Sequence, residues 1–269
     1  MPDARPIAAI PVEDVNRTFY EQAYSQAAGF PAAWRRQLSF DQQSKLHLNW
    51  LVLESWLREG RSVRRVLEVG FGFGLILRRF PSGVTLVGTE ISLNAARQLS
   101  QTCLSGQRRA LVCVHDSVGG LPFKTEFDVI ICSHVLEHVP DDMSLLKEFR
   151  RLLVPKGVLL LNVPINEELP DPKHVRAYDD HSLRRKLSDA GFHLIRELTA
   201  DRWSAFFERW QARYRSGLIL KIMRAGCALM PYAMSEWISD IWLRALPVRQ
   251  LIVLAVPEED ETTYVSQRS

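Results

Sequence analysis

Five short apolar runs separated by helical segments constrain the fold of this chain more than any other feature of its sequence. The runs span residues 65–69, 84–88, 110–114, 127–132 and 157–163. Segments with helical character lie between most of them, notably residues 92–104 and 141–153. Strands that are apolar on both faces and alternate with helices are typical of a parallel sheet covered on both sides. The pattern therefore predicts a doubly wound α/β architecture.

The segments at both ends extend this organisation. Prolines predict a loose tail over residues 1–14, and residues 15–60 have helical character up to Gly60. After the fifth run we expect a helix near 180–190, a strand at 192–198, a helical stretch at 203–247 and a last strand at 249–256. The predicted division is residues 1–60 as tail and helical cap, 61–257 as the main domain with 203–247 as an insert, and 258–269 as an acidic tail.

Composition excludes several classes of protein. Charged residues make up 24% and hydrophobic residues 46% of the 269 residues, which is an ordinary globular balance. The formal net charge of +3 is too small to indicate a nucleic-acid binder. We expect no secretory signal and no membrane span, because no apolar run reaches about 18 residues. The four cysteines form no C-x-x-C pair, so we expect a cytoplasmic protein.

A glycine-rich loop follows the first predicted strand. Gly70, Gly72 and Gly74 alternate there and precede a predicted helix at 75–80. Missing side chains let a backbone turn sharply and approach a ligand closely, and a helix N-terminus offers unpaired N–H groups. Sixteen residues after Gly74, at the end of the second run, Glu90 can accept hydrogen bonds from both hydroxyls of a ribose. Together these features predict a site for a nucleoside-containing cofactor.

The spacing of the loop excludes two such cofactor classes. A dinucleotide loop needs G-x-G-x-x-G, and a phosphate loop needs G-x-x-x-x-G-K-[ST]. Leu75 and Ile76 follow Gly74, so both patterns fail. The loop, preceded by Glu68, instead suits a cofactor whose charged end is an amino acid. A glycine-rich turn without a ligand is the alternative interpretation.

The pattern E-x-G-x-G-x-G at 68–74, with Glu90 at the next strand end, resembles the class I S-adenosylmethionine-dependent methyltransferases. The similarity covers residues 65–198 and the final strand. Leu121-Pro-Phe123 and the segment 127–141 resemble the small-molecule branch, which includes the ubiquinone- and menaquinone-biosynthesis type. The resemblance implies a Rossmann-like, seven-stranded, mostly parallel sheet with an antiparallel last strand, N-terminal helices and a helical insert before that strand.

The resemblance also implies which residues contact S-adenosylmethionine. They are Glu68, Gly70, Gly72 and Gly74 for the amino-acid end, Glu90 for the ribose, Ile91, Asp116 and Ser117 for the adenine, and the backbone of Ser133 for the methionine part. Relative to the family pattern, Asp116 lies one residue farther from Leu121-Pro-Phe123 than is usual.

The segment His134-Val-Leu-Glu-His138 also has the H-x-x-E-H spacing of a zinc-protease signature. Pro140 follows too soon for a helix to hold both histidines, and no third ligand is evident in the sequence. His134 also stands where similar cation-binding quinone-pathway methyltransferases carry a carboxylate. We therefore predict no metal. His134 and His138 are the candidate general bases, with a structural role as the alternative for each.

Three residues farther along are candidates for contact with the methyl acceptor. These are His174, Arg176 and Tyr178. For His174 a structural role is the alternative, and for Arg176 a surface ion pair. The leading hypothesis is methyl transfer to a small hydrophobic or aromatic molecule, with O-methylation favoured over C- or N-methylation. A nucleic-acid methyltransferase is disfavoured, because the fourth run ends in Cys132-Ser-His134 rather than an Asn/Asp-Pro-Pro-Tyr motif. The other alternative is a non-catalytic S-adenosylmethionine-binding protein.

The insert 203–247 carries an aromatic helical face. Its members are Trp203, Phe206, Phe207, Trp210 and Tyr214. Segment 201–249 holds eight basic and four acidic residues. A helical cap or lid is the favoured interpretation. The alternative is peripheral contact with an anionic membrane through residues 203–224. As partners we expect a small-molecule acceptor and no nucleic acid.

Overall fold

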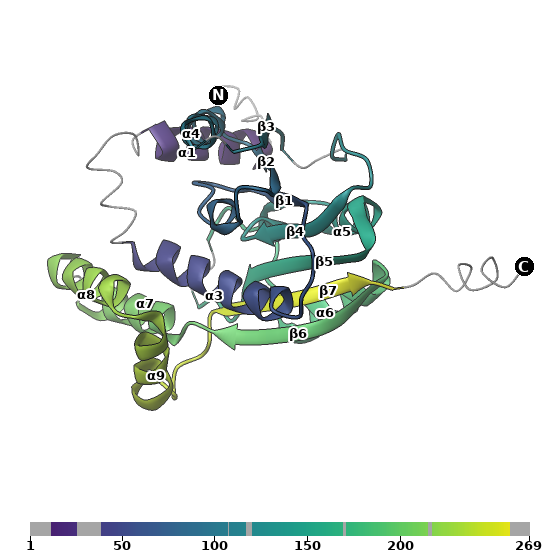
Figure 1. The fold of residues 1–269 in the computed structure, drawn as a ribbon. Helices are drawn as coiled ribbons and strands as arrows, with labels where there is room; N and C mark the ends of the chain where they lie inside the picture. Colours follow the sequence, from purple (N-terminus) through teal and green to yellow (C-terminus); the bar gives the residue numbers. More distant parts are fainter. Residues whose placement is uncertain are drawn as a thin grey trace, which may run out of the picture.

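The structure is a computed structural model that describes residues 12–25, 39–106, 108–116, 120–168, 171–214 and 217–258. Its centre is a seven-stranded sheet in the order β3-β2-β1-β4-β5-β7-β6 (Figure 1). The strands are β1 (Arg65–Val69), β2 (Thr85–Glu90), β3 (Ala110–Val114), β4 (Phe127–Ser133), β5 (Leu153–Pro164), β6 (Phe192–Ala200) and β7 (Gln250–Pro257). Only β7 runs antiparallel to its neighbours among these strands, so the predicted architecture is confirmed.

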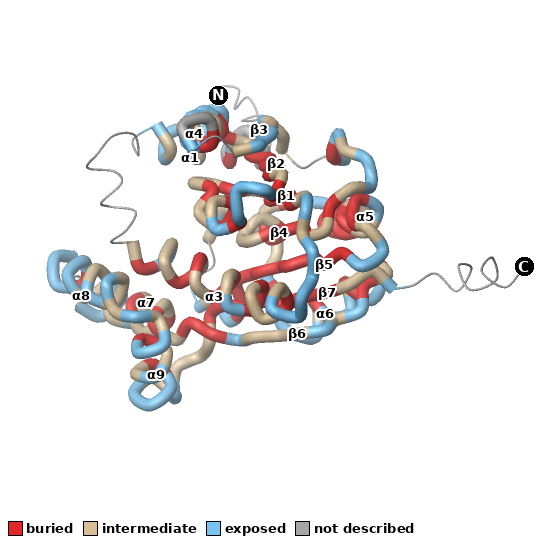
Figure 2. Tube along the Cα trace, in the orientation of Figure 1, coloured by how far each residue is buried: buried red, intermediate tan, exposed pale blue. Residues whose placement is uncertain are grey.

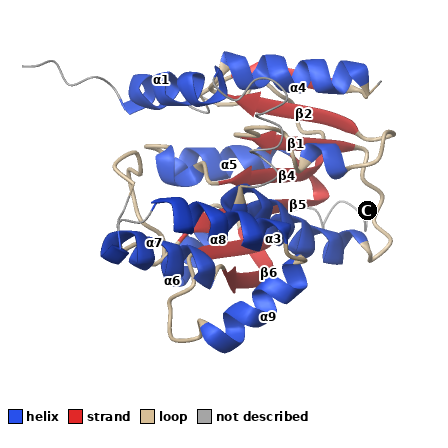
Figure 3. Ribbon diagram, turned by 90° about the vertical axis from the view of Figure 1, so that its left-hand side faces the viewer, coloured by secondary structure: helices blue, strands red, loops and turns tan. Residues whose placement is uncertain are grey.

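Helices cover both faces of the sheet. They are α1 (Val12–Ser25), α3 (Phe40–Leu57), α4 (Leu93–Ser105), α5 (Asp142–Leu152), α6 (Asp180–Asp189), α7 (Arg202–Tyr214), α8 (Gly217–Leu229) and α9 (Tyr232–Trp242). Residues of α5 and α6 belong to the buried core on one face, and residues of α3 and α4 to the core on the other. Helix α1 lies beside α4, next to β2 (Figure 3).

Strand β4 shows why the predicted strands are apolar throughout. Ile130 and Cys132 point into the core beneath α5 and α6, whereas Val129 and Ile131 point into the core beneath α3 and α4. Successive side chains of a strand point to opposite faces, so a sheet covered on both sides needs apolar residues at every position. Figure 2 shows this core as buried tubes through the centre of the molecule.

The structure corrects two local predictions. The helix predicted at 75–80 is only a single 3₁₀ turn at Leu77–Arg79, because the residue before Pro81 is driven to an extended backbone. Helix α1 begins at Val12, inside the predicted tail, and residues 1–11 lie outside the described part. The predicted stop at Gly60 is confirmed by its left-handed backbone, with φ +79°.

The helical insert lies at one particular edge of the sheet. Strand β6 is antiparallel to β7, which is antiparallel to β5, so β6 runs in the same direction as β1 and β4. The chain leaves the carboxyl end of β6 and forms α7, α8 and α9 before it returns as β7 (Figure 1). The insert therefore lies at the edge where the glycine loop follows β1.

Part of the aromatic face of α7 packs inward, whereas Tyr214 at its end is exposed. Trp203 and Phe207 form a small core with Phe40 of α3 and Leu220 of α8. The exposed apolar side chains of the insert lie mainly on α8 and α9 instead. Within the described residues, no helix is both long and apolar enough to span a bilayer.

We expect Gly74→Ala to lower the free energy of unfolding by about 1–3 kcal/mol, because its φ of +62° disfavours a side chain. A Cβ there would also lie 2.5 Å from Leu99 Cδ1 of α4. Gly83→Ala is the matched control, because a Cβ at that exposed glycine meets nothing within 4 Å. Its effect should stay within about 0.5 kcal/mol. Equal effects of the two substitutions in urea denaturation would contradict this account of the loop.

Candidate active site

A cavity of about 310 Å³ opens at the carboxyl edge of β1, β2 and β4. Such a volume suits a small-molecule ligand. Its walls come from α1, α3, the glycine loop, the ends of β2 and β3, and the loop after β4. The carboxyl ends of parallel strands are the usual position of ligands in open α/β sheets. The cavity is thus where the sequence analysis predicts a cofactor.

The glycine loop lies against the cavity wall with no room for side chains. Gly70 and Gly72 have φ angles of +69° and +54°, which favour glycine. A Cβ on Gly70 would lie 2.1 Å from Val135 Cγ2, and one on Gly72 would lie 2.8 Å from Tyr24 Oη. Glycine is therefore required at positions 70 and 72 by the local backbone and by close neighbours from the loop after β4 and from α1.

Glu90 connects the end of β2 to this loop. Its Oε2 accepts a hydrogen bond from the Gly72 N–H at 2.8 Å, and its Oε1 accepts one from the Ile91 N–H at 2.9 Å. Burial raises the pKa of this carboxyl, and the backbone donors oppose the rise. Oε1 also accepts a long hydrogen bond from the Ser92 N–H at 3.5 Å, whereas Oε2 has a second acceptor site for a ligand.

Glu68, in β1, is a second buried acid of the cavity wall. Burial raises its pKa to about 8, and the neighbouring Glu90 adds to the rise. Its Oε2 has no hydrogen-bond partner among the described residues. A buried, unpartnered carboxylate oxygen favours a cationic or hydrogen-bond-donating ligand group.

The other predicted cofactor residues are placed as follows. Ile91 and Asp116 line the cavity, and Asp116 also lies 3.7 Å from an Arg17 guanidinium nitrogen. Ser133 lines the cavity too, and its hydroxyl accepts a hydrogen bond from Asn49 Nδ2 at 2.9 Å. Ser117 lies outside the described residues.

The first candidate base, His134, lines the cavity on a left-handed backbone with φ +54°. Its Nδ1 lies 3.4 Å from Oε1 of the buried Glu137, while its Nε2 has no partner among the described residues. Burial, and then the nearby Lys45 ammonium, lower the pKa of His134. Burial opposes ionisation of Glu137, yet its contact with His134 keeps its pKa below the usual value. A neutral imidazole oriented by a carboxylate can accept a proton.

The second candidate, His138, has partners on both ring nitrogens. Nε2 lies 3.3 Å from the Tyr20 hydroxyl, and Nδ1 lies 3.1 Å from the Lys173 carbonyl oxygen. The structure also brings His174 close, with ring centroids 4.9 Å apart and its Nδ1 2.9 Å from Glu167 Oε2.

A possible third metal ligand, which the sequence did not reveal, is thus present near His138. Ligand atoms of Glu137, His138 and His174 lie within 4.8 Å of one another. An ion bound to all three would have to displace Tyr20 or the Lys173 carbonyl from His138.

Arg176 and Tyr178 do not line the cavity; they hold the loop beside it. The Arg176 guanidinium donates to the carbonyls of Leu136, Val139 and Pro140. The Tyr178 hydroxyl donates to Asp142 Oδ2 at 2.6 Å, and the side chain is buried. These contacts give both residues a structural function, and contact with an acceptor remains only a prediction for them.

Several cavity residues were not singled out in the sequence. From α1, Tyr20 and Tyr24 line the cavity, and Glu21 accepts hydrogen bonds from Leu93 N and Asn94 N at the start of α4. From α3, the residues are Gln42, Lys45 and Asn49. Gln42, Lys45 and Asn49 lie at i, i+3 and i+7 and share one face of α3, but other polar residues of the helix obscure this pattern in the sequence.

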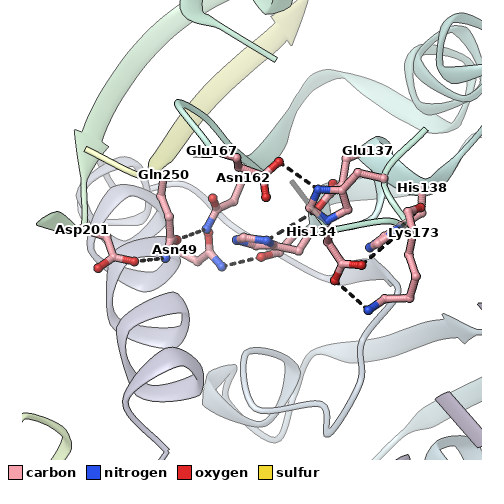
Figure 4. Close-up of polar contacts among 12 residues, drawn as sticks. Asn49, His134, Glu137, His138, Asn162, Glu167, Lys173, Asp201 and Gln250 are labelled. Carbon is pink, nitrogen blue, oxygen red and sulfur yellow. Dashed lines mark hydrogen bonds and ion pairs between the residues drawn. The ribbon is translucent and has the colours of Figure 1, made fainter. Parts of the chain in front are cut away.

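A chain of buried polar groups leads from the cavity to the insert (Figure 4). Asn49, whose amide donates to Ser133, accepts a hydrogen bond from Asn162 Nδ2 at 3.0 Å. The same Asn162 amide donates to Gln250 Oε1, and Gln250 Nε2 donates to Asp201 Oδ2 at 2.7 Å. Asp201 in turn accepts from the backbone N–H of Ser204 in the first turn of α7. The cavity wall and the insert therefore share one hydrogen-bonded network.

Comparison with known proteins identifies the class that this fold and site define. The chain matches the magnesium protoporphyrin IX methyltransferase of Synechocystis, solved with bound S-adenosylmethionine, with a TM-score of 0.58 at 14% identity over 93% of this chain and 99% of that one. It also matches the [4+2]-cyclase SpnF with a TM-score of 0.56 at 21% identity over 80% and 82% of the two chains. The fold is the Rossmann-like fold of these proteins.

Residues 40–197, more than half of the chain, match the family described as "Methyltransferase domain", and the chain belongs to that family. This confirms the predicted family, and with it S-adenosylmethionine as the cofactor. Relatives include the ubiquinone biosynthesis O-methyltransferases of Histophilus somni, 32% identical over 111 residues, and Pseudomonas aeruginosa, 28% identical over 138 residues. These matches cover 38% and 48% of this chain and 46% and 56% of the relatives, so the chain spans about half of their length.

Glu68→Gln should change the pH dependence of stability in the cofactor-free protein. The pKa of Glu68 rises from 4.5 in the unfolded chain to about 8 in the folded protein, so the folded state binds more protons between these values. This contribution to stability is complete below pH 4.5 and is lost as the pH rises to about 8, at about 1.4 kcal/mol per pH unit. Urea denaturation at several pH values measures the free energy of unfolding, which should fall with pH less steeply in Glu68→Gln than in wild type between pH 4.5 and about 8. Glu126→Gln, at a surface ion pair with Arg65, is the control. Identical slopes for wild type and Glu68→Gln would refute the assignment.

Proposed function

We propose that this chain methylates a hydroxyl group of a small hydrophobic or aromatic molecule, with S-adenosylmethionine as the methyl donor. S-adenosylmethionine supplies a methyl group already activated by its positively charged sulfur. The observation that carries the proposal is His134, neutral and backed by Glu137, in the wall of the cavity that also contains the glycine loop and Glu90. The relatives named O-methyltransferases support the choice of oxygen. We extend the proposal to a cytoplasmic location, which the four unpaired cysteines support.

The residues of the cavity fit the cofactor. The unpartnered Oε2 of Glu68 can accept a hydrogen bond from the ammonium group of the cofactor. The glycine loop carries no side chains, so the amino-acid end of the cofactor can lie close to its backbone. Glu90 would bind the ribose hydroxyls through its remaining acceptor sites. Ile91 and Asp116, which line the cavity, would contact the adenine. The backbone of Ser133 would lie near the methionine part.

The acceptor side of the cavity supports a phenolic or quinol-like molecule. Tyr20, Tyr24 and Phe73 provide aromatic surface there. A hydroxyl must lose its proton as the methyl group is transferred, and the imidazole of His134, which lines the cavity, would accept that proton. Lys45 lies on the same wall, and burial lowers the pKa of its ammonium group. While protonated, it stabilises negative charge on the acceptor oxygen.

Glu90→Ala should lower the affinity for both S-adenosylmethionine and S-adenosylhomocysteine by about 10- to 100-fold. A hydrogen bond to a charged group contributes about 1.5–3 kcal/mol, and the loop also loses its anchor. Calorimetric titration of the full chain measures the change. Glu54→Ala, at an exposed ion pair on α3, should bind like wild type. Unchanged affinity in Glu90→Ala would remove the ribose assignment, and failure of wild type to bind either compound would remove the proposed function.

His134→Asn should lower methyl transfer to phenolic and quinol acceptors by about 10²- to 10⁴-fold and leave cofactor affinity unchanged. Asparagine tolerates the left-handed backbone at this position better than most residues. In wild type the rate should rise with pH as His134 loses its proton, at a pH below the usual histidine value of 6.5. Incorporation of an isotopically labelled methyl group measures the rate. His193→Asn, at an exposed position of β6, is the control. A His134→Asn rate equal to that of wild type would show that transfer needs no base here.

A further inference from the structure

The outer surface of the insert is apolar although nothing in the described structure covers it. Helix α8 exposes Leu218, Ile219, Ile222 and Leu229, and α9 exposes Met234, Trp237, Ile241 and Trp242. We call these eight residues the insert face. Leu218 is 72% and Trp242 78% exposed. Both helices pack against α7, and large apolar side chains exposed in this number on a folded protein usually mark a contact site. In Figure 2, α8 and α9 are largely exposed, in contrast to the buried sheet.

The insert face follows from the helical repeat of the two helices. Leu218, Ile222 and Leu229 lie at i, i+4 and i+11, on one side of α8. The opposite sides of the helices supply Leu220, which is buried in the insert core, and Ser235 and Ser239, which are buried beneath α9. The helices thus use one side for folding and retain a second, apolar side facing outward.

Basic side chains accompany the insert face. Lys221 of α8, Arg213 of α7 and Arg244 after α9 are exposed, and none of them forms an ion pair with a described residue. Among the acids of the insert, Glu208 accepts a hydrogen bond from Arg249 and Glu236 is partly buried beside Tyr232, whereas Asp240 is largely exposed, 3.9 Å from Arg202. The surface therefore combines aliphatic and tryptophan side chains with an excess of positive charge.

We propose that the insert face binds peripherally to the surface of a bilayer that contains anionic lipid. Exposed tryptophans favour the boundary between headgroups and acyl chains, and lysine and arginine are attracted to anionic headgroups. A second copy of this chain fits less well, because a two-fold interface through this face would bring identical positive charges together. This surface differs from the predicted 203–224 segment, because Trp203 and Phe207 of α7 are buried in the insert core and α9 contributes instead.

The position of the insert adds a geometrical consequence. The insert follows the carboxyl end of β6, the edge at which the cavity opens, and α8 contacts α3, whose polar face lines the cavity. A bilayer bound by the insert face would lie at the same edge of the molecule as the cavity. The proposed docking does not depend on which acceptor is methylated, so it goes beyond the proposed function.

Cosedimentation of the full chain with two kinds of vesicle tests the proposal. Vesicles of phosphatidylcholine with phosphatidylglycerol should bind at least about tenfold more tightly than vesicles of phosphatidylcholine alone, and added salt should weaken the binding. The double variant Trp237→Ala with Trp242→Ala should bind the mixed vesicles at least about tenfold more weakly. Lys221→Glu with Arg244→Glu should lose the preference for the mixed vesicles.

Leu111→Ser is the matched control, because Leu111 is 50% exposed on the distant edge strand β3 and should leave vesicle binding unchanged. All variants should bind S-adenosylmethionine like wild type, which separates docking from folding and from the cofactor site. Absence of binding to the mixed vesicles, or equal binding by wild type and the double tryptophan variant, would overturn the proposal. So would a wild-type dimer in sedimentation velocity that the tryptophan variant abolishes, since this would assign the insert face to a second copy.

Discussion

The buried carboxylate of Glu90 is the interaction on which the cavity depends. Burying a carboxylate is costly unless hydrogen-bond donors surround it, and the N–H groups of Gly72 and Ile91 supply them. The Gly72 N–H belongs to a loop with positive φ angles, so the acid and the loop support each other's conformation. Tyr24 of α1 then contacts the loop, and Glu21 of the same helix caps α4. These contacts position α1 and the start of α4 beside the loop.

The strands and the loop were predictable from sequence because their physical signals are local. A strand buried on both faces needs a continuous apolar run, and β4 has one from Phe127 to Cys132. Alternating glycines followed by an acid at the next strand end also lie within one short segment. The same local signals predicted a helix at 75–80, where the structure has only a 3₁₀ turn at Leu77–Arg79. Pro81 restricts the backbone of the residue before it to an extended conformation, and this outweighs the helical propensity of the segment.

Side-chain functions that depend on distant partners were not predictable in this way. The family resemblance suggested Arg176 and Tyr178 as acceptor contacts, yet their partners are the carbonyls after β4 and Asp142, more than thirty residues earlier. Tyr20 reaches His138 from 118 residues away, and nothing in either local sequence signals that contact. Lys45 and Asn49 of α3 are a further case, because polar residues are spread around this helix and its periodicity does not single out the two that line the cavity.

The network from Ser133 to Asp201 makes the orientation of the insert part of the active-site geometry. Asn162 is buried in β5, and its side-chain amide donates hydrogen bonds to Asn49 of α3 and to Gln250 of β7. Buried amides of this kind are stable only when every partner is in place, so the network favours one arrangement of α3, β5, β7 and α7. Fold alone does not determine the reaction, as the resemblance to a cyclase illustrates. In the proposed function the chemistry depends on His134 and Glu137, and the network that connects the cavity wall to the insert would fix how a bilayer bound to the insert face is oriented toward them.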